Sequence, residues 1–265
     1  MSDEQEQDEK RQSAEKLVKM KEQVYKDPRP ESYFARFHKR TRTKKPDAMY
    51  EIVRMLVTLY GYGFFRLRSF RSDLVPQSGP VIIAPNHFSF MDHFFTGIAL
   101  RRKVQFMAKS QLFARPMQFV YTHGGVFPVR RGERDNDVFV TAHTVLERGA
   151  TLCMYCEGGR SRTGDLAEKP KPGIGKLALE SGAPVVPTAI YGSAKVRNWK
   201  RGQFPQVTVL YGEPLQFPRV LDPTREQAQA ASEVIFEEIK KLYGDLREHG
   251  RAGVAARLRA EHAIS

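Results

Sequence analysis

The stretch VIIAPNHFSFMD, residues 81–92, decides how this chain folds, because an apolar, strand-like run ends directly in a polar cluster. The arrangement recurs in TLCMYCEGGRSR, residues 151–162, where residues 151–155 resemble a strand and EGGRSR follows. In open α/β sheets, ligands bind where such strands end. The two stretches therefore predict an α/β domain whose site is assembled from loops at strand ends.

Short apolar runs alternate with helix-like stretches across the middle of the chain, which favours a βα arrangement. We expect strands at 81–85, 103–107, 125–129, 151–155, 184–190 and 206–211. We expect helices at 92–100, 111–122, 134–148, 174–181 and 224–246. Alternation at this spacing indicates an α/β fold with a mixed, largely parallel sheet flanked by helices, preceded by an N-terminal amphipathic helical extension.

Composition divides the chain into three parts. Residues 1–45 are charged and are expected to form a partly disordered or helical extension, in which the basic run 38–45 is a solvated tether. Residues 46–248 form the main domain. The Ala/Arg-rich residues 249–265 are expected to form a C-terminal tail, for which a last helix with no evident role is one interpretation.

Residues 46–70 predict a helix at the start of the main domain, because apolar residues such as Ile52, Leu56 and Leu59 recur at three- and four-residue spacing. One interpretation is an amphipathic helix that covers the core. The other is an interfacial helix that lies in a membrane surface, helped by the basic run before it. The longest apolar stretch, residues 55–65, is well short of the roughly 20 residues that a spanning helix needs, so no crossing is expected.

The formal charge of +13 and the pI near 9.8 favour anionic partners, which include phosphorylated ligands, acidic lipid surfaces and nucleic acid. The basic runs lack interleaved aromatics and a recognisable binding motif, so nucleic acid is not expected. The first residues are acidic and polar, which is unlike a secretory signal. The two cysteines, Cys153 and Cys156, are expected to be buried thiols, and no metal site is expected.

His87 and Asp92 are candidates for a general-base pair. A tight turn between them would bring the carboxylate to the imidazole, fix its tautomer and support the imidazolium that forms on proton uptake. The alternative is structural, because Ser89 to Asp92 also has the pattern of a helix capping box. The spacing alone leaves the two interpretations about even, and the second polar cluster favours the catalytic one.

The residues Glu157, Gly158, Gly159 and Arg160 are candidates for an anion-binding loop. Adjacent glycines allow backbone N–H groups to converge on an oxyanion or phosphate, and a guanidinium adds paired donors. The alternative is a surface turn with solvated charges. Placement directly after an apolar strand favours anion binding.

The chain resembles the glycerolipid acyltransferase family, whose best-known members are 1-acyl-sn-glycerol-3-phosphate acyltransferases. The resemblance spans roughly residues 50–215 and rests on blocks in a fixed order. The family's N-H-x-S-x-x-D is similar to residues 86–92, its A-K-x-x-L-F to 108–113, its glycine-to-arginine block to 124–131, its F-P-E-G-T-R-S to 155–161, and its V-P-x-x-I to 186–190. Cys156, Gly159 and Pro128 depart from the family pattern, which leaves the acceptor open.

The resemblance implies an enzyme that moves a fatty acyl group from acyl-CoA or acyl carrier protein to 1-acyl-sn-glycerol 3-phosphate, making phosphatidic acid without a cofactor. His87, oriented by Asp92, would take the hydroxyl proton. Lys109, Arg130 and Arg160 would hold the acceptor phosphate. Glu157 would orient the loop, or accept from a substrate hydroxyl, while the loop's N–H groups stabilise the oxyanion.

A lipid product and an amphipathic helix lead us to expect a peripheral protein on the cytoplasmic face of the cell membrane. Two alternatives remain open. One is the same chemistry on glycerol 3-phosphate or another lysophospholipid, and the other is a basic membrane-binding protein without enzymatic activity.

Overall fold

Seven strands form one sheet in the computed structural model, which describes residues 17, 18, 20, 26–131 and 135–264. The strands are β1 (Arg68–Phe70), β2 (Val81–Pro85), β3 (Val104–Lys109), β4 (Phe127–Val129), β5 (Thr151–Cys153), β6 (Val185–Tyr191) and β7 (Thr208–Tyr211). Their spatial order is β1-β7-β6-β2-β5-β3-β4. All neighbours are parallel except β6 and β7, which confirms the predicted mixed, largely parallel sheet.

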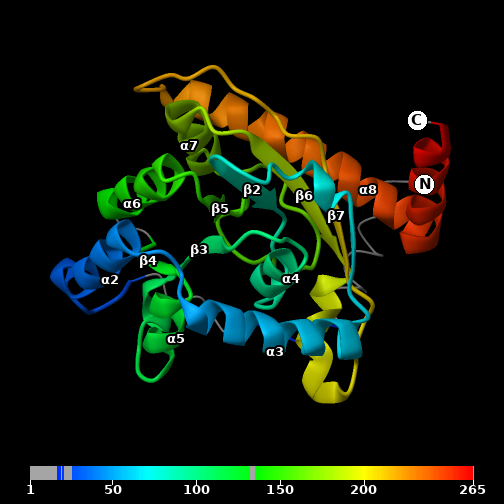
Figure 1. Cartoon of the computed structure of the whole chain (residues 1–265), viewed down its shortest axis with the longest axis horizontal. Helices are drawn as coiled ribbons and strands as arrows, with labels where there is room; N and C mark the ends of the chain where they lie inside the picture. Colours follow the sequence, from blue (N-terminus) through cyan, green and yellow to red (C-terminus); the bar gives the residue numbers. More distant parts are fainter. Residues whose placement is uncertain (1–16, 19, 21–25, 132–134, 265) are drawn as a thin grey trace.

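Helices cover both faces of the sheet, as Figure 1 shows. One face carries α3 (Ala48–Phe65) and α4 (Asp92–Ile98), and the other carries α6 (Asn136–Glu147), α7 (Gly173–Ser181) and α8 (Arg225–Ile264). Strand β2 is buried along its whole length, with Val81 and Ile83 in the core on the α3 side and Ile82 and Ala84 in the core on the other. This two-sided burial explains why β2 is a continuous apolar run rather than an alternating one.

The parallel direction of β2, β5, β3 and β4 collects their carboxyl ends at a single edge of the sheet. The last residues of these strands are Pro85, Cys153, Lys109 and Val129. Segments that lie 20 to 70 residues apart in sequence therefore meet there, including both polar clusters of the sequence. Strands β1 and β7 run the other way, so their first residues, Arg68 and Thr208, lie at this same edge.

The expectation that residues 38–45 form a solvated tether is wrong. Residues 38–43 belong to helix α2 (Glu31–Thr43), which packs on α6 and buries His38 and Thr41. His38 Nδ1 lies 2.9 Å from Thr141 Oγ1, and Arg42 ion-pairs with Asp137 at 2.5 Å. Residues before 26, apart from 17, 18 and 20, lie outside the described part of the chain, so the rest of the 1–45 extension stays a prediction.

The expected helix at 46–70 ends earlier than predicted. Asp47 caps α3 by accepting from Met49 N at 3.0 Å, and the helix closes at Arg66, whose left-handed backbone has a φ of 44°. Residues 68–70 form strand β1 instead, because this turn redirects the chain along the edge of the sheet. No helix in the described part of the chain combines the length and apolarity needed to cross a membrane.

Two other expected elements differ from the structure. The helix predicted at 111–122 is divided into η2 (Ser110–Leu112) and α5 (Met117–His123), because Pro116 disfavours helical backbone at the residue before it. At the C-terminus, α8 continues beyond residue 246 through a kink at Gly250, where φ is 62° and ψ is 177°. Its second half buries Val254 against Leu246, so residues 251–264 pack onto the domain.

Candidate active site

His87 and Asp92 form a hydrogen-bonded pair at the carboxyl end of β2. His87 follows the strand by two residues, and Asp92 is the first residue of α4. His87 Nδ1 lies 2.9 Å from Asp92 Oδ2. The Asp92 side chain is fully buried, whereas 12% of the His87 side chain is exposed, so the imidazole still reaches the surface. With Nδ1 donating to the carboxylate, Nε2 is left as the basic nitrogen.

The capping interpretation of Asp92 also holds, and it is compatible with the catalytic one. Asp92 Oδ2 accepts from the backbone N–H groups of Phe88 and Ser89, both at 2.7 Å, while Ser89 Oγ accepts from Met91 N at 3.2 Å. One carboxylate oxygen therefore closes the turn before α4 and binds the imidazole. Because the turn fixes this oxygen, the imidazole is oriented by backbone geometry.

The ring of Tyr155 fixes the orientation of the His87 imidazole. Its ring stacks on His87 with centroids 3.8 Å apart and an interplanar angle of 15°. Burial lowers the pKa of His87, an effect that the Asp92 hydrogen bond opposes and that the charges of Arg160 and Arg131 reinforce. A lowered pKa keeps His87 neutral near pH 7, which is the form that a general base requires.

The loop of residues 157–162 is bonded directly to His87. Glu157 Oε1 accepts from His87 N at 2.8 Å, and Ser161 N donates to the His87 carbonyl at 2.8 Å. Burial raises the pKa of Glu157 to about 7. Gly158 has a φ of 65°, which favours glycine, so the sequence EGG permits the turn that brings both ends of the loop to His87. The two polar clusters of the sequence are thus joined by hydrogen bonds into a single site.

Arg160 of this loop interacts electrostatically with two further groups, Lys109 and His87, and so does Arg131. Burial lowers the pKa of Lys109, at the end of β3, and the charges of Arg131 and Arg160 lower it further. The same two arginines act on His87. Arg160 makes no hydrogen bond or ion pair with any residue in the described part of the chain. The arrangement is suited to an anion placed near the imidazole.

Arg130 and Arg131 leave β4 in different directions. Arg130 Nη1 lies 3.7 Å from Glu31 of α2, and its backbone N–H donates to Asp135 at 2.8 Å. The charge of Arg131 instead lowers the pKa of Lys109 and that of His87. The predicted role of Arg130 in phosphate binding stays a prediction, and Arg131 is the neighbour that acts on the imidazole.

Sequence reasoning missed Arg197, which joins the two loops from η3 (Ser193–Arg201). Its guanidinium donates to the Phe88 carbonyl from Nε at 2.9 Å and from Nη2 at 2.6 Å. It also donates to the Arg162 carbonyl at 3.0 Å and to the Ser161 carbonyl. These acceptors are backbone carbonyls, which every residue has, so the sequence does not show where they lie. The only residue in these contacts that the sequence shows is the arginine itself.

The two cysteines are free and buried, as predicted. Burial raises the pKa of both thiols, so neither is a reactive thiolate near neutral pH. Within residues 26–131 and 135–264, His, Cys, Asp and Glu side chains form no group of three or more with the geometry of a metal site.

The chain was compared with known protein families and sequences. The Acyltransferase family model matches residues 66–191. A chloroplastic 1-acyl-sn-glycerol-3-phosphate acyltransferase of Arabidopsis thaliana is 27% identical over 149 residues, 55% of this chain and 41% of the relative. Human 1-acyl-sn-glycerol-3-phosphate acyltransferase beta is 28% identical over 155 residues, 57% of this chain and 55% of the relative. The matches thus span about half, or less, of these relatives' own length.

A solved structure supports the same fold. The crystal structure of the 1-acyl-sn-glycerophosphate acyltransferase PlsC of Thermotoga maritima aligns with a TM-score of 0.53 and 22% identity, covering 79% of this chain and 88% of that one. The family match includes His87, Asp92 and the loop of residues 157–162. Residues 66–191 therefore match the Acyltransferase family, and the chain is similar to glycerolipid acyltransferases.

Proposed function

We propose that this chain transfers a fatty acyl group from acyl-CoA or acyl carrier protein to the free hydroxyl of 1-acyl-sn-glycerol 3-phosphate, which yields phosphatidic acid. The observation that carries the proposal is that His87 is bonded on two sides: its imidazole binds Asp92, and its backbone N–H and carbonyl bind the loop of residues 157–162. A base and an anion-binding loop at one point are what acyl transfer to a phosphorylated alcohol requires.

In the first step, His87 Nε2 takes the proton from the acceptor hydroxyl while that oxygen attacks the thioester carbonyl carbon. Asp92 accepts from Nδ1 and stabilises the imidazolium that forms. The tetrahedral intermediate collapses, the carbon–sulfur bond breaks, and the sulfur leaves with its electron pair. The imidazolium then returns its proton to the thiolate, which restores the base.

The oxyanion of the intermediate is stabilised by the backbone of the same loop. Gly158 N already donates to the Tyr155 carbonyl, and Ser161 N to the His87 carbonyl. Within the described part of the chain, the N–H groups of Gly159 and Arg160 make no hydrogen bond to another backbone group. These two donors form the proposed oxyanion site, which typically contributes 10²–10³ in kcat per donor.

The acceptor phosphate is bound by Lys109, Arg160 and Arg131. Support comes from the electrostatic interaction of the three cations with one another and from the absence of an ion pair between Lys109 or Arg160 and any carboxylate among the described residues. The phosphate would replace the missing negative charge. Charge-assisted bonds of this kind hold the glycerol hydroxyl next to His87.

A different acceptor is the main alternative. Glycerol-3-phosphate acyltransferase of Pseudomonas aeruginosa is 24% identical over 189 residues, 56% of this chain and 22% of that relative. Both acceptors carry a phosphomonoester, so the proposed cations suit either one. The test must therefore compare acceptors directly.

A thiol-release assay with purified protein tests the proposal. Several acyl-CoA lengths are combined with 1-acyl-sn-glycerol 3-phosphate, glycerol 3-phosphate and an unphosphorylated monoacylglycerol. We expect turnover that depends on the phosphate, and a loss of at least about 10³-fold in His87→Ala. His143→Ala is the matched control, because it removes an imidazole of α6 that pairs with Glu180 of α7. An equal rate of thiol release with phosphorylated and unphosphorylated acceptors would contradict the roles of Lys109 and Arg160.

Helix α3 supports a peripheral position on a membrane, with the cytoplasmic leaflet as the predicted side. Its large exposed side chains are Ile52, Met55, Leu56, Leu59, Tyr62 and Phe64, between 47% and 69% exposed. Such an apolar strip along one helix is typical of interfacial association. Leu59→Ser should reduce sedimentation with vesicles, and unchanged sedimentation would argue against the contact.

A further inference from the structure

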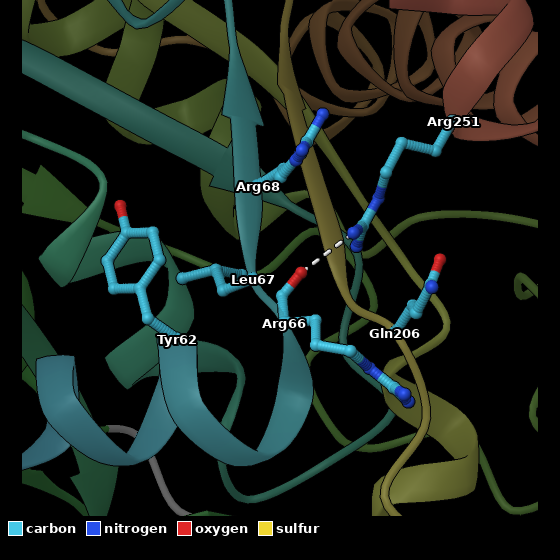
Figure 2. A pocket seen from close by; sticks show the side chains of 6 residues that line it. All are labelled: Tyr62, Arg66, Leu67, Arg68, Gln206 and Arg251. Carbon is cyan, nitrogen blue, oxygen red and sulfur yellow. Dashed lines mark hydrogen bonds between the residues drawn. The ribbon is translucent and has the colours of Figure 1, made fainter.

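A cavity of about 490 Å³ opens at the C-terminal end of α3, between β1 and the second half of α8. Figure 2 shows the side chains that line it, Tyr62, Arg66, Leu67, Arg68, Gln206 and Arg251. A second cavity of similar volume shares Arg68, Gln206 and Arg251 and continues along α8 to Arg259. Neither of these cavities is lined by His87 or by the loop of residues 157–162, so they are separate from the proposed reaction site.

The cavity is strongly positive. Arg66, Arg68 and Arg251 form no ion pair with any carboxylate in the described part of the chain. The Arg68 side chain makes no hydrogen bond to the described residues either, and the Arg66 side chain makes one, to the Phe204 carbonyl at 2.6 Å. Three guanidinium groups held together without a counter-charge form a site for an anion.

Arg251 is fixed in place by the backbone. Its guanidinium donates to Thr208 Oγ1 at 2.9 Å, to the Arg66 carbonyl at 2.7 Å and to the Val207 carbonyl at 2.6 Å, and Figure 2 marks the bond to Arg66. These bonds use three of its five N–H groups and leave two. The kink at Gly250 directs Arg251 towards β1 and β7. The cationic wall of the cavity is thus preorganised.

The cavity is continuous with the apolar strip of α3. Met55, Leu59 and Tyr62 follow each other at four- and three-residue spacing, so they lie along one face of the helix. All three are exposed, and Tyr62 also lines the cavity. An apolar strip that ends in a cationic pocket matches the order of groups in a phospholipid, whose acyl chains adjoin an anionic headgroup.

We infer that the cavity of Arg66, Arg68 and Arg251 binds the phosphate of an anionic phospholipid headgroup at the membrane surface. The inference rests on the membrane contact proposed above for α3, and it adds a headgroup site to that contact. Arg251 and the α3 terminus supply the fixed donors, and Arg68 supplies a donor with no other partner. Binding there orients the domain on anionic membranes without involving the acyltransfer residues.

Vesicle sedimentation at fixed ionic strength tests the inference, with phosphatidylcholine vesicles and with vesicles that also contain phosphatidylglycerol. Arg68→Gln is the diagnostic variant, because the Arg68 side chain makes no hydrogen bond or ion pair within the described part of the chain. Arg225→Gln is the matched control, since it removes the same charge at the start of α8, on the opposite side of the sheet from α3. Thermal melting checks that both variants are folded.

We expect Arg68→Gln to lower the affinity for phosphatidylglycerol vesicles by about tenfold or more, and Arg225→Gln by less than about twofold. Neither change should alter the weak binding to phosphatidylcholine. Equal losses in the two variants, or no preference of the wild-type chain for phosphatidylglycerol, would overturn the inference. Displacement from vesicles by adenosine 3′,5′-bisphosphate, the phosphate-bearing end of CoA, would also overturn it by assigning the pocket to a soluble ligand.

The variants distinguish a failure of the headgroup site from a failure of the proposed reaction or of the α3 contact. Leu59→Ser should reduce binding to both kinds of vesicle, whereas Arg68→Gln should reduce binding only to the anionic one. Thiol release is measured with soluble components, so failure of acyl transfer leaves the vesicle result unchanged. A loss in Leu59→Ser alone would retain the membrane contact and remove the headgroup site.

Discussion

Arg197→Lys is the perturbation that most directly tests how the two loops of the site are held together. The arginine binds three backbone carbonyls, those of Phe88, Ser161 and Arg162, with a planar fork of donors. Lysine keeps the positive charge but presents a single ammonium on a flexible stem. It can reach one of these carbonyls, so at least two are left without their charged donor.

The magnitude follows from these bonds. A hydrogen bond to a charged group contributes about 1.5–3 kcal/mol, so two lost bonds set an upper bound of roughly 3–6 kcal/mol. Water reaches this partly exposed region and replaces part of that, which leaves about 2–3 kcal/mol. If the bonds serve to align His87 with the loop, this energy appears as a decrease in kcat of about 30- to 150-fold.

Steady-state kinetics with the acyl donor and the preferred acceptor, together with thermal melting, measures the effect. We expect kcat to fall in Arg197→Lys while KM for each substrate changes by less than about threefold, and Arg197→Ala to fall further. A lowered melting temperature with an unchanged kcat would refute the reasoning, because it would show that Arg197 only stabilises the fold. A raised KM with an unchanged kcat would instead assign it to substrate binding.

Three further predictions concern neighbours of the imidazole. Asp92→Asn should lower kcat by about 10³–10⁴-fold in steady-state assays with little change in KM, because a neutral amide no longer stabilises the imidazolium; a loss below tenfold would contradict this. Tyr155→Phe should keep activity within about threefold and Tyr155→Ala should not, since the stacked ring is what orients His87. Burial raises the pKa of Glu157 to about 7, so between pH 4.5 and 7 this carboxyl is protonated in the folded chain and ionised in the unfolded chain. The free energy of unfolding of the wild-type chain, measured by urea denaturation, should therefore fall by about 2 kcal/mol from pH 5 to 7. Glu157→Gln should not show this fall.

The sequence was sufficient to predict the parts of the site that follow strands. The buried strand β2 has no polar residue along its length, so the change from Ala84 to His87 marks both the end of β2 and the start of the site. The same change after β5 marks the loop of residues 157–162. Parallel strands end at one edge, which is why two clusters seventy residues apart meet at His87.

Other features left weaker signals or none. Helix α2 had a signal, because Phe34, Phe37, His38 and Thr41 recur at helical spacing and are all buried; the net charge of the run obscured it. Strand β1 had none, since only three residues form it and a non-glycine residue, Arg66, adopts the left-handed turn before it. The contacts of Arg197 and Arg251 are with backbone carbonyls, and such acceptors are the same at every position of a sequence.

The cations around His87 lead to a last prediction, which concerns the order of events in the reaction. Burial and the charges of Arg160 and Arg131 lower the pKa of His87 in the free chain. A bound phosphate dianion would neutralise part of that charge, so the pKa of His87 should rise when the acceptor binds, and its strength as a base should rise with it. The pH dependence of kcat/KM reports the free enzyme and that of kcat reports the complex.

The acid limb of kcat should therefore lie at a higher pH than the acid limb of kcat/KM for the acceptor. In Arg160→Gln the two limbs should move closer together. Without the Arg160 charge the pKa of His87 is lowered less in the free enzyme, so the bound phosphate has less positive charge to neutralise and raises that pKa less. Coincident limbs in the wild-type enzyme would show that the phosphate does not approach the imidazole closely enough to change its pKa. In that case the cations near His87 would serve a group other than the acceptor phosphate.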